Sequence, residues 1–302
     1  MSHYTFIVNP AAGRGDATKL VRRLRGALRE RGIDHTIVLT AAPGDATTKA
    51  RESASDVVVA VGGDGTINEV ANGLVGSSKA LGIIPAGSGN DFIKSCGIPE
   101  DFEQALAILC AGKRRRIDLG TVQCMKDGAN GSEQPEVRCF VNGVGIGFDA
   151  AVAARTQEIR HVSGTALYLL AVFQTLGRYS FPTFTYKVDH TIRESKNLLI
   201  AVGNGRCAGG GFYLTPDAVI DDGWLDICVI EEKSVPQILR LMSRVMKGKH
   251  GDIPGVTIFR DTGLVASARE PFHVHADGEI VGRNVNRVDI GIMKACLDVV
   301  VG

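Results

Sequence analysis

The sequence has almost no excess of charge of either sign. Its 34 lysine and arginine residues oppose 33 aspartate and glutamate residues, which gives a formal net charge of +1. Such a chain has no overall field that would draw it onto nucleic acid or onto an acidic membrane. A nucleic-acid partner is therefore not expected, and any membrane contact has to be local.

The sequence also lacks a cysteine motif and a long apolar run. Its seven cysteines are scattered, without a CxxC or Cys/His spacing, which is typical of reduced thiols in a cytoplasmic protein. The longest apolar helix candidate, residues 166–176, is far shorter than the roughly 20 residues that span a bilayer. The apolar run at residues 4–8 is too short for a signal peptide. We therefore expect a soluble, cytoplasmic protein.

Strand-like and helix-like segments alternate over the first part of the chain. Apolar runs predict strands at residues 4–8, 33–39, 57–61 and 80–85, and helical patterns separate them. Such alternation predicts right-handed βαβ units and a parallel sheet. The expected fold here is an α/β nucleotide-binding domain with a mostly parallel, doubly wound sheet, formed by residues 1–121.

The pattern changes after residue 121. Short β-like runs follow one another without alternating helices, which predicts a β-rich, sandwich-like second domain over residues 122–281. Two helices interrupt these runs, at residues 164–176 and 235–247. The second is basic and amphipathic, and such a helix either covers a sheet or lies on a membrane.

Two glycine-containing loops follow neighbouring predicted strands. The first glycine loop, residues 62–66, reads GGDGT, and the second glycine loop, residues 87–91, reads GSGND. A strand, a glycine turn and a helix start present backbone N–H groups to a phosphate. Side chains would block that approach, and we expect positive φ at the glycines. Both loops should lie at the carboxyl edge of the sheet, where α/β proteins bind ligands.

Several motifs together resemble the diacylglycerol kinase catalytic fold, which bacterial lipid kinases, sphingosine kinases and ceramide kinases share. They are VGGDGTINEVANGL at residues 61–74, IPAGSGNDF at 84–92, FVNGVGIGFD at 140–149 and DGE at 277–279. More distant relatives with a similar GGDG loop are NAD kinases and phosphofructokinases. The resemblance covers nearly the whole chain and implies that its end, residues 282–302, rejoins the first domain.

The resemblance implies a nucleotide site for ATP in the first domain. Its elements match the residues Asn9, Pro10, Gly13, Thr40, Gly62, Gly63, Asp64, Gly65, Thr66, Asn68, Glu69, Gly87, Ser88 and Asn90. Taken alone, Asn9 is equally well a turn residue before proline.

Mg²⁺ is the expected metal, because no Walker lysine follows the loop and hard oxygen ligands suit this ion. Asp64, Asp91 and Asp118 each close a loop after a β run, and the resemblance indicates the same three positions. The alternative is that each aspartate caps a helix or turn. The resemblance also implies a second, structural metal site, with the Asp222 carboxylate and the Val219 and Trp224 carbonyls as ligands. A plain Asp-Gly β-turn is the alternative there.

A kinase also needs a base for the hydroxyl that it phosphorylates. Asp277 is the candidate, with Glu279 two residues along on the same side of an extended segment. His273 and His275 share that alternation and are rival bases on chemistry alone. An exposed hairpin turn is the alternative for Asp-Gly-Glu.

The sequence therefore predicts an ATP- and Mg²⁺-dependent lipid kinase that acts on diacylglycerol or a related lipid and touches the membrane surface transiently. Two alternatives stay open: an NAD kinase-like enzyme, and a catalytically silent lipid-binding protein on the same fold. The sequence leaves open whether the chain forms a homodimer.

Overall fold

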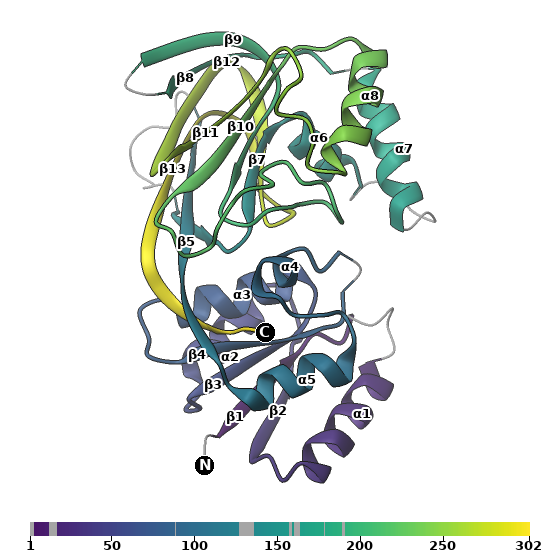
Figure 1. Cartoon of the computed structure of the whole chain (residues 1–302), viewed down its shortest axis with the longest axis vertical. Coiled ribbons are helices and arrows are strands. Elements are labelled where there is room, and N and C mark those ends of the chain that lie inside the picture. Colours follow the sequence, from purple (N-terminus) through teal and green to yellow (C-terminus); the bar gives the residue numbers. More distant parts are fainter. Residues whose placement is uncertain are drawn as a thin grey trace. The chain divides into compact units, whose positions relative to one another are not determined.

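The computed structural model describes residues 3–11, 17–87, 89–126, 136–156, 159, 164–177, 179–188 and 191–302. The chain forms two compact units (Figure 1). Unit 1 contains Met1–Leu119 and Lys294–Gly302, and unit 2 contains Gly120–Met293. No helix of the described residues is long and apolar enough to cross a membrane.

Unit 1 is built from alternating strands and helices, as the sequence predicted. Its elements are β1 (Tyr4–Val8), α1 (Ala17–Glu30), β2 (His35–Leu39), α2 (Asp45–Glu52), β3 (Val57–Gly62), α3 (Asp64–Leu74), β4 (Ala80–Pro85), α4 (Phe92–Cys96) and α5 (Phe102–Ala111). The next strand, β5 (Arg114–Met125), begins in unit 1 and continues into unit 2.

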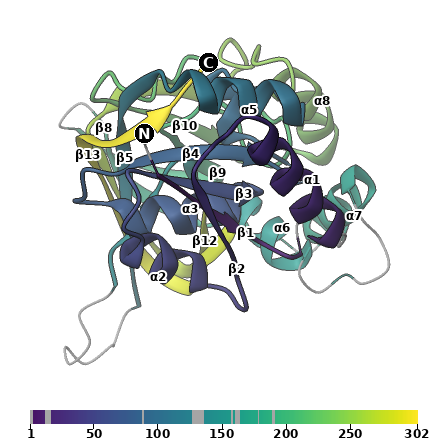
Figure 2. The same cartoon turned by 90° about the horizontal axis from the view of Figure 1, so that it is seen from below.

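The sheet of unit 1 is parallel, in the order β2-β1-β3-β4, with the end of the last strand of the chain beside β4. Every residue of β3 and β4 is buried, which explains why both strands read as unbroken apolar runs. Figure 2 shows α1 and α5 on one face of this sheet and α2 and α3 on the other. Both glycine loops therefore follow central, buried strands.

Unit 2 is rich in antiparallel strands. Its elements are β6 (Arg138–Phe140), β7 (Gly143–Gly147), α6 (Phe148–Thr156), α7 (Gly164–Leu176), β8 (Thr183–Val188), β9 (Thr191–Gly203), β10 (Leu225–Glu231), α8 (Val235–Val245), β11 (Val256–Asp261), β12 (Gly263–Ala276) and β13 (Glu279–Val300). Strand order runs β11-β10-β9-β7-β12-β13, and β8 pairs with both β9 and β12.

Two apolar cores form on opposite faces of this sheet, because successive strand residues point to opposite sides. In β9, the side chains of Ile200 and Val202 pack in the first core, which residues of the strands form. Leu199 and Ala201 enter a second core, which α6, α7 and α8 complete. The helices of unit 2 thus cover one face of its sheet.

The sequence did not predict two short helices, α4 and α6, and it placed the domain boundaries differently. The chain returns to unit 1 at Lys294, whereas the sequence analysis expected the return at residue 282. The boundary lies inside the 22-residue strand β13, which has no break in composition. A boundary inside a continuous strand leaves no linker for sequence analysis to find.

Candidate active site

The two glycine loops of unit 1 contact each other through their backbones. A Cβ placed on Gly63 would lie 3.1 Å from the Cα of Gly87, and one placed on Gly87 would overlap the Cα of Gly63. The Asn90 side chain closes the second loop, because its Oδ1 accepts from Gly87 N at 3.1 Å and its Nδ2 donates to Gly87 O at 3.0 Å. The structure therefore brings the two loops together at the carboxyl edge of the sheet, as predicted.

The expected positive φ at these glycines is wrong. Gly63 has φ −97° and extended backbone, and neither Gly62 nor Gly87 is left-handed. The left-handed residue is Asn90, with φ 48°. Glycine is needed here because a side chain at Gly62 would overlap Thr66, and one at Gly87 would overlap Gly63.

Asn9 and Thr66 connect β1 to the first glycine loop. Asn9 Nδ2 donates to Thr66 Oγ1 at 3.2 Å, and Asn9 Oδ1 accepts from Ala11 N at 2.9 Å. Thr40, directly after β2, donates its backbone N–H to Val8 O at 3.0 Å, at the same edge of the sheet. Pro10 lies in the exposed turn that follows β1. The predicted residues Gly13 and Ser88 fall outside the described part of the chain.

Two further predicted nucleotide ligands hold other structural elements. Glu69 Oε2 accepts from Ala46 N at 3.1 Å, and so it caps the first turn of α2. Asn68 is 1% exposed, and it accepts from Asn72 Nδ2 through both its backbone and its side-chain oxygen. Asn68 is thus buried in the helix packing of unit 1, whereas Glu69 is half-buried.

Asp64 connects the first glycine loop to the second. Its Oδ2 accepts from Asp91 N and its Oδ1 from Phe92 N, both at 3.1 Å. Asp91 is 3% exposed, and its Oδ1 forms an ion pair with Lys94 Nζ at 2.8 Å. A Cβ on Gly89 would lie 3.2 Å from Asp64 Oδ2 and 4.0 Å from Asp91 Oδ2. The two carboxylates thus converge beside Gly89.

Asp118 fixes the returning end of the chain. Its Oδ1 accepts from Ala295 N at 2.6 Å, while Arg116 Nε donates to Ala295 O at 2.6 Å. Ala295 is left-handed, with φ 46°, so these two side chains hold a kink in β13. Asp118 is 2% exposed.

Of the three predicted Mg²⁺ ligands, the structure brings Asp64 and Asp91 together beside Gly89, whereas Asp118 is hydrogen-bonded to Ala295. Among the residues that the structure describes, no group of three or more His, Cys, Asp and Glu side chains is placed to hold a metal ion. Mg²⁺ is commonly bound by one or two carboxylates together with substrate phosphates and water. The converging carboxylates of Asp64 and Asp91, beside a glycine, match that requirement.

In unit 2, the carboxylate of Asp277 accepts three backbone hydrogen bonds. Val141 N donates to its Oδ2 at 2.8 Å, and Asn142 N and Gly143 N donate to its Oδ1 at 3.0 and 2.9 Å. Asp277 is 9% exposed and left-handed, with φ 48°. The segment does form a hairpin turn, since Ala276 pairs with Glu279, and Gly278 is exposed in it, but the Asp277 carboxylate is buried against residues 141–143.

Glu279 and His273 lie on either side of this turn. Arg138 Nη2 forms an ion pair with Glu279 Oε2. His273 Nδ1 accepts from Asn284 N at 3.3 Å, and burial, followed by the charge of Arg283, lowers its pKa below the ordinary value of 6.5. His273 thus keeps the chemistry of a neutral imidazole near pH 7.

His275 forms a nearly buried pair with Asp149, which the sequence did not predict. His275 Nε2 lies 3.3 Å from Asp149 Oδ2, and the side chains are 10% and 12% exposed. Both line a narrow cavity together with Asn142, Gly143, Ala201 and Leu214. His275 Nδ1 and Asn142 Oδ1 are buried there without a hydrogen-bond partner among the described residues.

The turn predicted to hold a second metal is closed by its own hydrogen bonds. Asp222 Oδ1 accepts from Trp224 N at 3.0 Å, and Asp222 Oδ2 lies 3.6 Å from Arg260 Nη1. Gly223 is left-handed, with φ 78°. Val219 lies just before this turn, half-buried. This geometry matches the Asp-Gly turn that was the alternative interpretation.

The sequence matches known families over both parts of the chain. Residues 3–122 match the diacylglycerol kinase catalytic domain, and residues 142–301 match the YegS C-terminal NAD kinase beta sandwich-like domain. A diacylglycerol kinase of Mycobacterium tuberculosis is 32% identical over 280 residues, with 91% of this chain and 88% of the relative covered. The chain belongs to the diacylglycerol kinase family. A YegS-like lipid kinase of Citrobacter koseri is 31% identical over 77% of each chain.

Solved structures share this family's fold. A diacylglycerol kinase of Bacillus anthracis superposes with a TM-score of 0.72 at 23% identity, over 100% of this chain and 97% of that one. Yeast NADH kinase, solved with NADH, superposes with a TM-score of 0.57 at 10% identity, over 100% and 84%. The chain is therefore a lipid kinase by family, on a fold that NADH kinase shares.

Proposed function

We propose that this lipid kinase transfers the γ-phosphoryl group of ATP to the hydroxyl of diacylglycerol. The observation that carries the proposal is the backbone contact between the two glycine loops, with the Asp64 carboxylate connecting them. Phosphoryl transfer is catalysed mainly by positioning and by neutralising charge, and little covalent chemistry is required.

The nucleotide phosphates are assigned to the first glycine loop and the start of α3. The helix begins at Asp64, so its first backbone N–H groups, which lack partners within the helix, are directed at the loop. Gly62, Gly63 and Gly65 keep the approach clear of side chains. Thr66 Oγ1 accepts from Asn9, so its own proton can be donated to a phosphate oxygen.

Asp64 and Asp91 would hold Mg²⁺, which neutralises charge on the phosphates when it is bound. Lys94, paired with Asp91 at 2.8 Å, keeps that carboxylate in place. Asp118 holds the returning strand at Ala295 and acts on the site through the backbone.

The acceptor hydroxyl is assigned to unit 2 and to Asp277. Backbone N–H groups of Val141, Asn142 and Gly143 hold this carboxylate in place, and we assign proton acceptance to it. Glu279, paired with Arg138, positions the turn that carries Asp277. The lipid substrate implies transient contact with a membrane surface by a cytoplasmic protein.

The proposal is tested by incubating the purified chain with labelled ATP and Mg²⁺ and offering diacylglycerol, monoacylglycerol, sphingosine and NAD in separate reactions. We expect a labelled lipid from diacylglycerol and none from NAD, and we expect EDTA to abolish the product. Formation of labelled NADP instead would overturn the lipid assignment.

A matched pair of variants tests the nucleotide site. Gly63→Val places a branched side chain against Gly87, whereas Gly26→Val makes the same change in α1, where nothing lies within 4 Å of a Cβ. We expect ATP affinity to fall in Gly63→Val alone. Equal ATP affinity in the two variants, measured by calorimetry, would contradict the assignment of the first glycine loop.

A further inference from the structure

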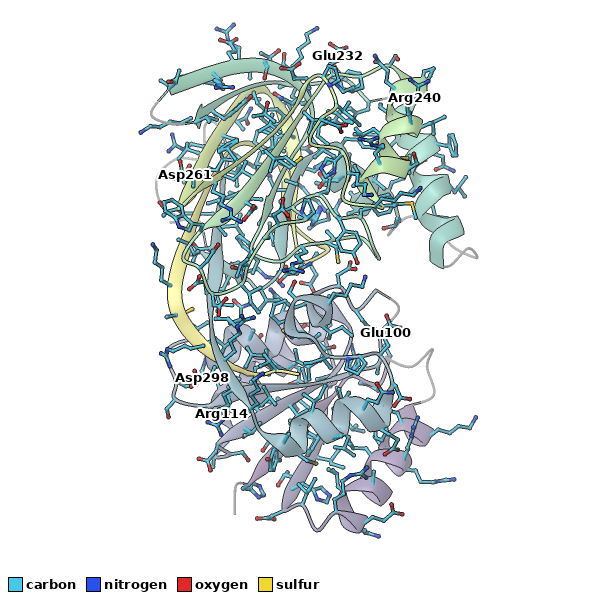
Figure 3. All side chains as sticks on the ribbon, viewed as in Figure 1. Glu100, Arg114, Glu232, Arg240, Asp261 and Asp298 are labelled. Atoms are coloured by element: carbon cyan, nitrogen blue, oxygen red, sulfur yellow. The ribbon has the colours of Figure 1, made fainter. Side chains whose placement is uncertain are left out.

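His275 and Asn142, both buried in unit 2, each have one polar atom without a partner. On the surface of the unit, polar side chains such as Glu232 and Arg240 are exposed to solvent, which satisfies them (Figure 3). Nδ1 of His275 and Oδ1 of Asn142 have no hydrogen-bond partner among the described residues, and the two residues as a whole are 8% and 4% exposed. Such atoms are costly in a protein interior unless something binds to them.

His275 and Asn142 line one cavity at strands β7, β9 and β12. The cavity exists because small residues face each other on neighbouring strands: Gly143 of β7 pairs with Gly203 of β9, and both line it together with Ala201. Its volume is about 20 Å³. Since roughly 10–15 Å³ suffices for one water molecule, the cavity has room for one molecule of that size and not for a lipid headgroup.

The two ring nitrogens of His275 have different roles. Nε2 lies 3.3 Å from Asp149 Oδ2. Because a carboxylate only accepts hydrogen bonds, Nε2 carries the proton of the neutral ring and donates it to Asp149. Nδ1 of the neutral ring is then an acceptor. A molecule that binds in the cavity therefore has to donate a proton to Nδ1.

The side-chain amide of Asn142 is oriented by its contact with the backbone of Cys207. Asn142 Nδ2 donates to Cys207 O at 2.5 Å, so the other side of the amide presents Oδ1, which only accepts. The cavity thus contains two acceptors, and its occupant has to donate twice. A water molecule has two protons to donate, whereas a hydroxyl group has one. Mg²⁺ fits less well, because it requires octahedral oxygen ligands.

We propose that this cavity binds one water molecule, which donates to Nδ1 of His275 and to Oδ1 of Asn142. The backbone N–H of Asn142 donates in turn to Asp277 Oδ1 at 3.0 Å. The water therefore connects the pair of Asp149 and His275 to a residue that holds the Asp277 carboxylate. His275 is in this way a positioning residue for Asp277, and it acts through the water and Asn142.

The catalytic consequence rests on the proposed function, since it concerns the candidate base of a lipid kinase. The water site itself does not, because water binding can be measured without ATP and without lipid. Failure of this inference and failure of the kinase proposal are therefore distinguishable.

The water is tested by magnetic relaxation dispersion, which counts water molecules that stay bound in solution, and by a crystal structure of the full chain. We expect one water within about 3.2 Å of both acceptor atoms. His275→Leu removes the acceptor and should lose one bound water, whereas His275→Gln keeps a donor and an acceptor and should retain it. His35→Leu is the matched control and should lose none, since His35 is a half-buried histidine of β2 whose Nδ1 contacts Ile33 O at 2.7 Å.

The positioning role is tested by kinetics at about pH 8, above the ordinary pKa of histidine. Because a displacement of about 1 Å can cost about 10²-fold in rate, His275→Leu should lower kcat by about ten- to a hundredfold. ATP affinity should not change, and His275→Gln should keep most of the activity. A merely structural role would lower the melting temperature of both variants and leave kcat of the folded protein unchanged.

Four outcomes would overturn the inference. The unaltered chain could bind no water between the two acceptors, or anomalous diffraction could show a metal ion there instead. A folded His275→Leu that has lost the water could turn over normally. Finally, His275→Gln could retain the water and still lose as much kcat as His275→Leu, which would exclude positioning through the water.

Discussion

His275 Nε2 lies 3.3 Å from Oδ2 of Asp149, and Gly145 provides the space in which the two side chains meet. A Cβ on Gly145 would overlap both the imidazole and the carboxylate. The pair joins β12 to the first turn of α6, and both residues line the cavity next to Asn142 and Gly143. Gly143 in turn donates to Asp277. The pair therefore supports the backbone that holds the candidate base.

Gly145→Ala should separate this pair. Overpacking in a well-packed interior typically costs about 1–3 kcal/mol, and the free energy of unfolding should fall by that amount in urea titrations. Gly26→Ala, in the interior of α1 with open space around it, should instead raise it by about 0.5–1 kcal/mol. A stable Gly145→Ala with normal kcat would show that the pair has no role in support.

Gly87→Ala should disrupt the contact between the two glycine loops. Its Cβ would overlap the Cα of Gly63, and backbone cannot move aside as a flexible side chain can. We expect weaker ATP binding by calorimetry and a lower melting temperature. Gly76→Ala, in the turn after α3, is the control for a glycine substitution without a close backbone contact, because a Cβ on Gly76 meets nothing within 4 Å and only its left-handed conformation opposes the change. An ATP affinity that is the same in both variants would count against the loop contact.

Asp277→Asn should reduce both turnover and stability. An amide presents N–H groups where the carboxylate accepts from Val141, Asn142 and Gly143, and an unsatisfied buried donor costs about 1–3 kcal/mol. A lost general base lowers kcat by about 10²–10⁴. Glu279→Gln keeps the backbone contacts of Asp277, so it should lower kcat less and leave the melting temperature almost unchanged. Normal kcat in a folded Asp277→Asn would remove Asp277 from the mechanism and make His273 the next base to test.

Stability should fall as the pH drops through the ordinary pKa of histidine. Burial lowers the pKa of His250 below 6.5, and Arg244 acts in the same direction. The folded state therefore binds fewer protons than the unfolded state in this range, so the free energy of unfolding decreases as the pH falls from about 7.5 to about 5.5. Urea titrations at both pH values should show a smaller decrease in His250→Gln. The same decrease in that variant would assign the effect to another group, of which His273 is the first candidate.

The parallel sheet could be predicted because each of its central strands carries a clear local signal in its own residues. β3 and β4 are buried on both faces, and each ends at glycine or proline followed by a small-residue loop. The position of the glycine loops followed from that pattern. The reason why glycine is needed in these loops could not be predicted, because it is the close contact with a neighbouring loop and not a positive φ.

The contacts that pair distant residues could not be predicted from one sequence. Asp118 and Ala295 are 177 residues apart, and His275 and Asp149 are 126 residues apart. Neither pair leaves a periodic signal. Helix α6, in contrast, could have been predicted from its composition, because four alanines and an acidic first turn at Asp149 favour a helix.

The last nine residues of the chain, Lys294–Gly302, are part of the first unit. They place Asp298 beside Ala80 in the parallel sheet, and Val301 and Gly302 donate to Lys113 O and Cys96 O. Leu297, Val299 and Val300 are almost fully buried there. On the ribosome, most of unit 1 is made first, but residues 294–302, which complete its sheet, follow only after unit 2. The edge of β4 therefore stays open until unit 2 has been translated, and the sheet of unit 1 cannot be completed before then.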